Sequence, residues 1–456
     1  MALIGDGRGG VFCENTLERM ATWSEVMQQK IKPGGFDVVL TNPPFGKKIV
    51  VKGEPLLSQF DLGYKWKRNK ETKSVEKTST LHDDQPPQIL FLERCLQLLK
   101  PGGRLGIVLP ESIFGNPSYQ FIIAWLTQRF QIAVIASMPE ALFKTSGKGG
   151  THTKVCILIG TKKQPDKQFD IFMGEARWCG HDSHGNQTYR KDAFGNMRLL
   201  DEIPAVAERY VAWRSGSDKF IADHQGFILP SNNIIHGIFI PRYYNPEIKA
   251  EIERLSHEYK FITIGELVKQ HAISIETGIE IGKMAYGTGS IPFIRTSDIS
   301  NWEIKADFKH GVSNEIYESF RNKIDVQAGD ILVVKDGTYL VGSSAIVTDS
   351  DLPMLFQSHL YRIRVLKQDE IDPWLLFVLL NTPLVRLQVK AKQFTQDIID
   401  TLGMRIHEIA LPIPRDNTRS TQVSDDCKRI IEMRIKLRGD ASKLVASIGS
   451  IEQNSA

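Results

Sequence analysis

Asn42, Pro43, Pro44 and Phe45 follow directly on the β-branched and apolar run Phe36–Thr41. Two consecutive prolines remove two backbone N–H donors and stiffen the turn. In an open parallel sheet, ligands bind beyond the carboxyl ends of the strands. A rigid turn there would direct the Asn42 amide oxygen and the Pro43 carbonyl at one point, with Phe45 as a flat apolar face beside them. This arrangement suits a planar group that carries an NH2, and an ordinary Asn-Pro turn is the alternative.

Short apolar runs and helical patterns alternate over residues 1–160, and these elements must position the turn. Further strands are predicted at Arg104–Pro110, Ile132–Ser137 and Lys154–Ile159, and helices at Gln88–Leu99 and Tyr119–Arg129. Strands without polar alternation, separated by helices, indicate a mainly parallel sheet that is covered on both faces. The fold class predicted for this part is α/β.

The string FDVVLTNPPFG resembles the catalytic motif of N6-adenine DNA methyltransferases, specifically the modification subunits of type I restriction–modification systems. The resemblance continues through QILFLERCLQLLKPGGRLGIVLPESIFG, MPEALF and THTKVCILIG, and so covers nearly all of residues 1–160. It implies a doubly wound, Rossmann-like sheet and transfer of a methyl group from S-adenosylmethionine to an adenine that is flipped out of duplex DNA. It also implies that Asn42 and the Pro43 carbonyl accept hydrogen bonds from the adenine amino group, that Pro44 stiffens the turn, and that Phe45 stacks on the base.

The sequence departs from that family before the turn. Only 41 residues precede Asn42, whereas the family places a glycine-rich donor-binding loop and a ribose-binding acid well upstream of it. The stretch Gly5–Gly10 matches G-x-G-x-x-G, but only Ala2–Ile4 precede it, so a glycine-rich turn explains it better than a phosphate site. The cofactor-binding residues are therefore unknown. We expect a partial methyltransferase sheet whose N-terminal part comes from a partner polypeptide or a longer reading frame.

A basic and aromatic stretch follows the turn. Between Asp61 and Thr80 there are six Lys or Arg residues against three acids, interleaved with two aromatic residues. Such a segment either forms a solvated surface loop or binds phosphates near the flipped base. The residues predicted to bind DNA here are Lys47, Lys48, Lys65, Lys67 and Arg68.

The second half is β-rich and resembles a target-recognition domain of type I specificity subunits over roughly residues 260–450. The resemblance rests on the order of SIPFIRTSDI, GDILV, DGTYLVG and LPIP ahead of a long helical pattern. Such domains bind a few base pairs through loops in the major groove. Candidate DNA contacts are Arg295, Lys335, Tyr339, His359 and Arg362, although a strand or surface ion-pair role fits each of them equally well. A β-rich accessory domain is the alternative for the region as a whole.

The last predicted helix carries a stripe with spacings of four and three residues. Its members are Val423, Cys427, Ile430, Arg434, Leu437, Ala441, Leu444 and Ile448, apolar at every position except Arg434. This stripe indicates either a core-facing helix or a strut that docks a partner. The predicted domains are thus a catalytic part at 1–160, a hairpin and helix connector at 161–225, a recognition domain at 226–415 and a helical spacer at 416–456.

The composition is that of a globular chain and argues against a membrane-spanning protein. The 41% hydrophobic and 24% charged residues are typical of a globular chain, and a net charge of +4 permits a nucleic-acid partner without demanding one. No apolar run approaches the ~20 residues of a membrane span, and five scattered cysteines suggest a reducing cytoplasm. Cys179, His181 and His184 lack a fourth ligand, so no metal site is expected.

The predicted function is a site-specific DNA methyltransferase with double-stranded DNA, S-adenosylmethionine, a polypeptide that completes the catalytic domain, and possible restriction-subunit partners. One alternative is a DNA-binding specificity protein that has lost catalysis. Another is a methyltransferase that acts on RNA or on a protein glutamine, because Asn-Pro-Pro turns occur in those enzymes too.

Overall fold

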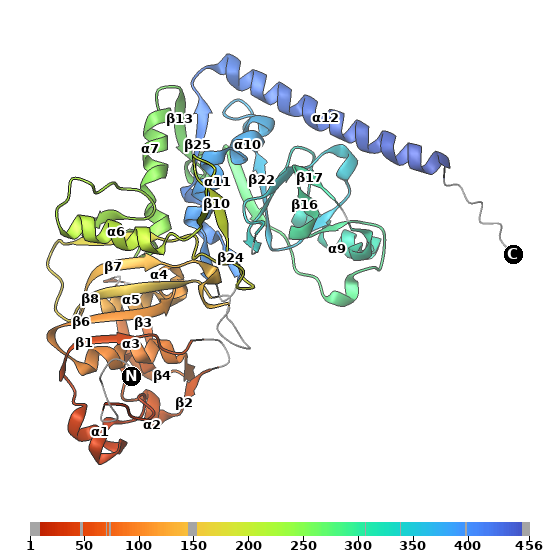
Figure 1. Ribbon diagram of the computed structural model, residues 1–456. Coiled ribbons are helices and arrows are strands. Elements are labelled where there is room, and N and C mark those ends of the chain that lie inside the picture. Colours follow the sequence, from red (N-terminus) through yellow and green to blue (C-terminus); the bar gives the residue numbers. More distant parts are fainter. Residues whose placement is uncertain are drawn as a thin grey trace. The chain divides into compact units, whose positions relative to one another are not determined.

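The chain is described by a computed structural model over residues 10–45, 49–69, 71–72, 74–144, 153–305, 307–337, 339–396 and 399–448. It divides into two compact units. Unit 1 comprises Met1–Pro246 with Thr395–Ile398, and unit 2 comprises Glu247–Phe394 with Ile399–Ala456. Figure 1 shows unit 1 in red to green and unit 2 in green to blue.

Unit 1 is built on a six-stranded sheet of order β1-β6-β8-β7-β9-β12 (Figure 1). The strands of this sheet are β1 (Phe36–Thr41), β6 (Leu99–Pro110), β7 (Gln131–Ser137), β8 (Val155–Thr161), β9 (Asp170–Glu175) and β12 (Phe227–Pro230). The helices of the unit are α1 (Glu25–Lys30), α2 (Glu54–Leu57), α3 (Pro87–Leu98), α4 (Ser112–Gly115), α5 (Gln120–Leu126) and α6 (Ile203–Arg214). Two short pairs complete it, β2 (Val51–Lys52) with β5 (Asp84–Gln85), and β10 (Tyr189–Lys191) with β11 (Met197–Leu199). The hairpin of β3 (Tyr64–Arg68) and β4 (Val75–Leu81) precedes α3.

Helices cover both faces of this sheet, as expected for the α/β class. On one face, buried residues of α3 and α5 such as Leu92 and Ile122 pack on Leu105 and Ile107 of β6. On the other face, Val206 of α6 joins Phe172 of β9 in a separate cluster. Fully buried side chains of this kind each contribute on the order of 1.5–3 kcal/mol.

The strand directions differ from the mainly parallel sheet predicted above. β1 and β6 are parallel, as are β7 and β9, but β8 lies between β6 and β7 and is antiparallel to both. Apolar runs that are buried on both faces look alike in either direction, so periodicity could not distinguish them. The hairpin predicted for the connector at 161–225 joined Phe169–Trp178 to Gln187–Tyr189. In the structure β9 instead pairs with β7 and β12 in the main sheet.

Glu93 of α3 holds the start of the β3–β4 hairpin. Its carboxylate accepts hydrogen bonds from the backbone N–H groups of Asp61 at 2.8 Å and Leu62 at 2.9 Å. The side chain is buried, and this burial raises the pKa of Glu93 from 4.5 to about 7. The folded state therefore binds more protons than the unfolded state between these two values.

We expect this carboxyl group to stabilise the fold fully below about pH 4.5 and to lose that contribution as the pH rises through about 7. The contribution of Glu93 to the free energy of unfolding amounts to about 2–3 kcal/mol. Urea unfolding of wild type and Glu93→Gln between pH 5 and 8 measures it. The variant should lose this part of the pH dependence, whereas exposed Glu208→Gln should keep it. Equal pH dependence in all three proteins would contradict the assignment.

Unit 2 contains a four-stranded antiparallel sheet of order β14-β22-β18-β20. Its strands are β14 (Ile273–Thr277), β18 (Ile331–Val334), β20 (Ser344–Ile346) and β22 (Leu360–Val365). The remaining pairs are β13 (Tyr259–Thr263) with β25 (Ala410–Pro414), β15 (Phe293–Ile294) with β21 (Leu355–Phe356), β16 (Ile299–Ser300) with β17 (Glu303–Ile304), and β19 (Asp336–Gly337) with β24 (Ile399–Thr401). The helices are α7 (Pro246–Leu255), α8 (Ile264–Lys269), α9 (Asn314–Ile324), α10 (Pro373–Leu380), α11 (Pro383–Lys392) and α12 (Asn417–Ile448). The second half therefore contains the predicted strands, but its helices hold more residues than its strands, so it is mixed α and β rather than β-rich.

The apolar pattern from Asp372 to Lys390 forms two helices rather than one. Asp372 caps α10 by accepting hydrogen bonds from the N–H groups of Trp374 and Leu375 at 2.9 and 3.0 Å. Pro383 then starts α11, because proline has no N–H to continue the preceding helix. Proline fits the first turn of a helix, where the N–H group has no partner in any case.

The long helix α12 (Figure 1) is buried near its start and exposed towards its end. Cys427 and Ile431 are buried in the core of unit 2. Leu437, Leu444 and Ile448 are 71%, 63% and 83% exposed. The predicted stripe thus faces the core only near the start of α12. The exposed remainder of the stripe is still compatible with the predicted strut that docks a partner.

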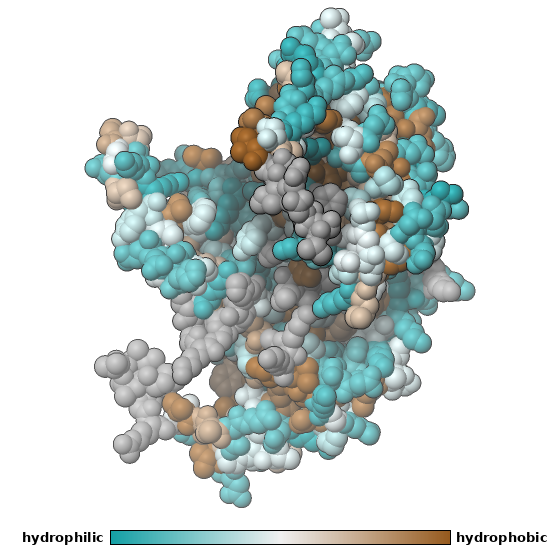
Figure 2. All heavy atoms as spheres, turned by 90° about the vertical axis from the view of Figure 1, so that its right-hand side faces the viewer, coloured by the Kyte–Doolittle hydropathy of each residue, from teal (hydrophilic) through white to brown (hydrophobic). Residues whose placement is uncertain are grey.

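None of the described helices is long and apolar enough to span a membrane. On the face drawn in Figure 2, hydrophilic residues predominate, and hydrophobic residues form separate patches rather than one continuous band.

Candidate functional site

The candidate site lies at the edge of the unit 1 sheet where four strands end. Strands β1, β6, β7 and β9 run in the same direction, because β6 and β7 are both antiparallel to β8. Their carboxyl ends therefore meet at one edge, which is where ligands bind in open α/β sheets. Thr41 of β1 lies opposite Ile107 of β6, and β6 continues to Pro110, so the turn at Asn42 lies beside the last residues of the neighbouring strand.

The four residues of the turn differ in exposure in the way a binding site requires. Pro43 is buried and anchors the turn, whereas Asn42 and Pro44 are exposed and Phe45 is half-buried. Among the described residues, the Asn42 amide makes no hydrogen bond, so it is available to a ligand. Lys47 and Lys48, which were predicted to assist, lie outside the described residues.

Phe143 is a site residue that the sequence analysis missed. It ends the 3-10 helix Glu140–Phe143, which follows β7 at the same edge of the sheet. Its ring centroid lies 5.8 Å from that of Phe45, and the ring planes cross at 78°. An edge-to-face pair of this kind fixes the Phe45 ring. The signal available in the sequence was the string MPEALF, which was quoted only for its resemblance.

A buried ion pair lies at the ends of β6 and β7. Glu111 directly follows β6, is 1% exposed, and pairs with the guanidinium group of Arg242. The Ser137 hydroxyl lies 3.4 Å from the same Glu111 oxygen and 3.3 Å from the Cys156 sulfur. Burial raises the pKa of the Cys156 thiol well above its usual range, and the nearby Glu111 carboxylate adds to this rise. The thiol is therefore protonated and is not a nucleophile.

Arg242 belongs to the segment Pro241–Tyr244, which the sequence analysis assigned to the recognition domain. In the structure this segment lies in unit 1, and Tyr243 is part of the core beneath the sheet. Both partners of the ion pair were missed, because the string that contains Glu111 was quoted only for its resemblance and Arg242 was assigned to the recognition domain.

The basic stretch after the turn forms the β3–β4 hairpin. Trp66 holds it to unit 1, since its ring packs on the core of that unit and its indole N–H donates to the Asp61 carbonyl at 3.1 Å. Within the hairpin, Lys77 of β4 lies 5.0 Å from the Tyr64 ring centroid. Lys67 and Arg68 are exposed and have no ion-pair partner among the described residues. Lys65 lies 3.5 Å from Asp83.

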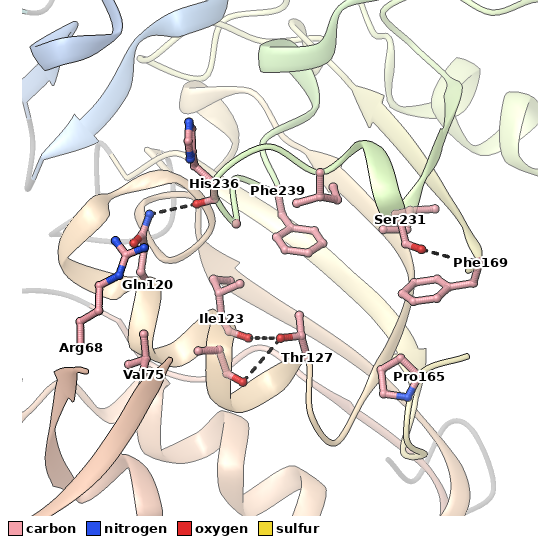
Figure 3. Close-up of a pocket in the computed structure, with 14 residues that line it drawn as sticks. Arg68, Val75, Gln120, Ile123, Thr127, Pro165, Phe169, Ser231, His236 and Phe239 are labelled. Carbon is pink, nitrogen blue, oxygen red and sulfur yellow. Dashed lines mark hydrogen bonds between the residues drawn. The ribbon is translucent and has the colours of Figure 1, made fainter. Parts of the chain in front are cut away.

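An apolar cavity of unit 1 is separate from the Asn42 turn. It has a volume of about 420 Å³, and Figure 3 shows Ile123, Phe169 and Phe239 around it, with Arg68 beside Gln120 at one end. Ile171 begins β9 and Ser231 follows the antiparallel β12, so the cavity lies at the amino end of β9. It therefore contributes nothing to the site at the opposite edge.

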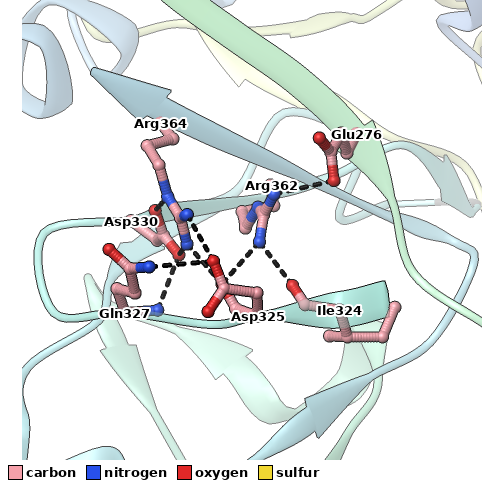
Figure 4. Close-up of polar contacts among 7 residues, drawn as sticks. All are labelled: Glu276, Ile324, Asp325, Gln327, Asp330, Arg362 and Arg364. Carbon is pink, nitrogen blue, oxygen red and sulfur yellow. Dashed lines mark hydrogen bonds and ion pairs between the residues drawn. The ribbon is translucent and has the colours of Figure 1, made fainter. Parts of the chain in front are cut away.

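The predicted DNA contacts of unit 2 have different surroundings. Arg362 is 4% exposed, and its guanidinium group binds the Ile324 and Asp325 carbonyls and the Glu276 carboxylate (Figure 4). The neighbouring Arg364 binds Asp330 at 2.6 Å and Asp325 at 2.8 Å. This network holds the end of α9 to the sheet and leaves Arg362 no free donor surface for a base.

The other four predicted DNA contacts of unit 2 differ in whether their side chains already have polar partners within the protein. Arg295 lies in a network with Asp298 at 3.2 Å and the His310 ring at 2.9 Å. Lys335 and His359 both pair with Asp336, at 3.2 and 2.9 Å. Tyr339 is 83% exposed and is the most accessible member of the set.

The first part of the chain matches one family model. Residues 10–200 match the family described as N-6 DNA Methylase. The chain is 24% identical over 283 residues to the methylase subunit of the type I restriction enzyme EcoEI from Escherichia coli, covering 56% of this chain and 45% of that protein. The chain thus spans less than half the length of this curated relative.

Two solved structures illustrate the range of similar folds. A chain from a type I restriction–modification system matches with 21% identity and a TM-score of 0.33, covering 50% of this chain and 40% of that one. The type IIG restriction endonuclease BpuSI matches with 11% identity and a TM-score of 0.36, covering 86% of this chain and 49% of that one.

Proposed function

Since residues 10–200 match the N-6 DNA methylase family, we propose that the Asn42 turn is the acceptor site of an adenine-N6 DNA methyltransferase of a restriction–modification system. The observation that carries this proposal is the free Asn42 amide, which projects from the carboxyl edge of the sheet beside the paired rings of Phe45 and Phe143. A planar base with an exocyclic amine fits this combination of hydrogen-bond acceptor and aromatic face.

Each residue of the turn has a distinct role in the proposed reaction. The Asn42 amide oxygen and the Pro43 carbonyl accept the two hydrogen bonds that an amino group donates. These bonds hold the nitrogen in place and increase its electron density, so no strong side-chain base is needed. Phe45, held by Phe143, stacks on the adenine, which reaches the site only when it leaves the duplex.

The methyl donor of this family is S-adenosylmethionine, but the described residues do not form a site for it beside β1. β1 is an edge strand of the described sheet, and Val38 and Leu40 on it are 41% and 78% exposed. Strands in parallel sheets are ordinarily buried on both faces. We propose that a further polypeptide segment pairs with β1, covers these two side chains and supplies the donor site.

Double-stranded DNA is the proposed substrate for both units. The exposed Lys67 and Arg68 of the β3–β4 hairpin would bind phosphates of this DNA. Unit 2 is proposed as the target-recognition domain, with the loop at Tyr339 as its most accessible candidate for base contacts. A restriction subunit is a further proposed partner.

A second candidate function is a DNA-binding specificity protein without catalysis, which the open edge of β1 favours.

Isothermal titration of S-adenosylmethionine into the purified chain tests whether the chain alone binds the methyl donor. We expect no binding at micromolar concentrations, and binding once the missing segment is co-expressed. Micromolar binding by the chain alone would show that the donor site is complete without a partner.

A further inference from the structure

Unit 2 contains a polar pocket of about 490 Å³ that the proposed function does not yet use. It is lined by the turn of the β16–β17 hairpin, by the chain just before β20, and by one arginine from each of α11 and α12. The lining residues that matter here are Ser300, Asn301, Trp302, Ser343, Arg386 and Arg434.

Hydrogen-bond donors dominate this pocket. The Arg386 side chain is exposed and donates to the Asn381 amide oxygen at 3.0 Å, and Arg434 donates to the Asn301 carbonyl. Within the described residues, neither arginine pairs with a carboxylate. Glu303 is the one acid among the described residues that line the pocket. Two guanidinium groups with unused N–H groups and a single carboxylate favour an anionic ligand.

The backbone of the hairpin turn is in an unusual conformation. Asn301 and Trp302 have φ angles of +49° and +71°, and Ser300 pairs with Glu303 across the turn. Such two-residue turns ordinarily have glycine at the second position. Trp302 tolerates it because its ring packs edge-to-face on the buried Phe377, with centroids 5.2 Å apart. The turn is therefore held by the core, and the pocket wall is rigid.

Arg434 is also the one interruption of the apolar stripe on α12. The side of this helix that packs into the core carries Cys427 and Ile431, so the fold does not need a cation at 434. The guanidinium carbon of Arg434 lies 6.0 Å from the Trp302 ring centroid. Its charge is thus placed at the pocket rather than in the core or on the fully exposed side.

We propose that this pocket holds a phosphate of duplex DNA. The inference rests on the proposed role of unit 2 in DNA binding and assigns the place where the DNA backbone is held. Leu340 lines the pocket and follows Tyr339 directly, so the proposed phosphate site lies beside the loop that carries a candidate base contact. Phosphate contacts of this kind position a protein on DNA without reading its sequence.

The test compares Arg386→Gln with Arg321→Gln, an exposed arginine of α9 outside the pocket, in the full-length chain. Fluorescence anisotropy with a mixed-sequence duplex at several salt concentrations measures affinity and its salt dependence. Arg386→Gln should weaken binding about tenfold, by loss of one charge-assisted contact. It should also reduce the slope of log K against log salt by about one. Ser343→Asp, which adds a negative charge to the same pocket, should weaken binding as well, and Arg321→Gln should match wild type.

Three results would count against the proposal or its premise. If the wild-type chain binds no duplex, the proposed DNA-binding function of unit 2 itself is wrong. If the duplex binds but Arg386→Gln and Ser343→Asp behave like Arg321→Gln, only the pocket assignment fails. If calorimetry shows inorganic phosphate binding that is lost in Arg386→Gln while duplex affinity is unchanged, the pocket takes a free phosphate and the assignment to DNA is overturned.

Discussion

Replacing Asn42 with alanine is expected to reduce methyl transfer by at least about 100- to 1,000-fold, the range measured when one polar group that stabilises a transition state is removed. The amide oxygen is the side-chain acceptor at the carboxyl edge of the sheet, and the Pro43 carbonyl alone cannot accept both amine hydrogens. Incorporation of labelled methyl groups into duplex DNA, with the enzyme completed by its donor-binding part, measures the effect.

The fold and the DNA affinity should be unaffected by this change. Asn42 is exposed and makes no hydrogen bond within the described chain, so its loss should change the free energy of unfolding by no more than about 0.5 kcal/mol. Asn42→Asp, which keeps the acceptor oxygens, should retain part of the activity. Exposed Asn232→Ala, away from the turn, should retain all of it. Full methyl-transfer activity in Asn42→Ala would contradict the assignment of the acceptor site.

Replacing Glu111 with alanine is expected to destabilise unit 1 by about 3–5 kcal/mol, the usual cost of leaving one charge of a buried ion pair without its partner. The Glu111 side chain is 2% exposed and that of Arg242 is 10% exposed, so water cannot replace the lost carboxylate. Urea unfolding followed by tryptophan fluorescence measures the change. With two units in the chain, the transition of unit 1 must be resolved from that of unit 2.

Two controls identify the cause of this destabilisation. The double variant Glu111→Leu with Arg242→Met removes both charges and should be more stable than Glu111→Ala. Lys163→Met breaks an exposed ion pair of 3.0 Å with Asp166 and should cost less than about 1 kcal/mol. A cost for Glu111→Ala no larger than that of Lys163→Met would show that the pair does not hold the strand ends together.

The strands and helices of the first 160 residues could be predicted because their apolar periodicity is strong. Phe36–Thr41, Gln131–Ser137 and the helix of α3 appear within one or two residues of their predicted bounds. The directions of the strands and their order in the sheet could not be predicted, because the apolar patterns of β8 and β9 do not depend on which strand each of them pairs with. The extent of unit 1 was missed for the same reason, because β9 and β12 join its sheet from beyond residue 160.

Charged residues were the least predictable part of the molecule. Arg362 carries no mark in the sequence that distinguishes it from a DNA-binding arginine, yet it is buried among carbonyl and carboxylate oxygens. Glu111 and Arg242 are 131 positions apart and become partners only when the chain folds. Apolar periodicity indicates which residues are buried, but it does not indicate which charged side chains form ion pairs with one another.

The sequence by itself determined the chemistry of the turn. A strand followed by Asn42, two prolines and Phe45 specifies a rigid acceptor beside an aromatic face, because these are local properties of neighbouring residues. Tertiary structure alone decided what surrounds that turn. Phe143 beside Phe45, the ion pair behind the strand ends, the open edge of β1 and the pocket at Arg434 all depend on contacts between distant segments, and such contacts leave no periodic trace in the chain.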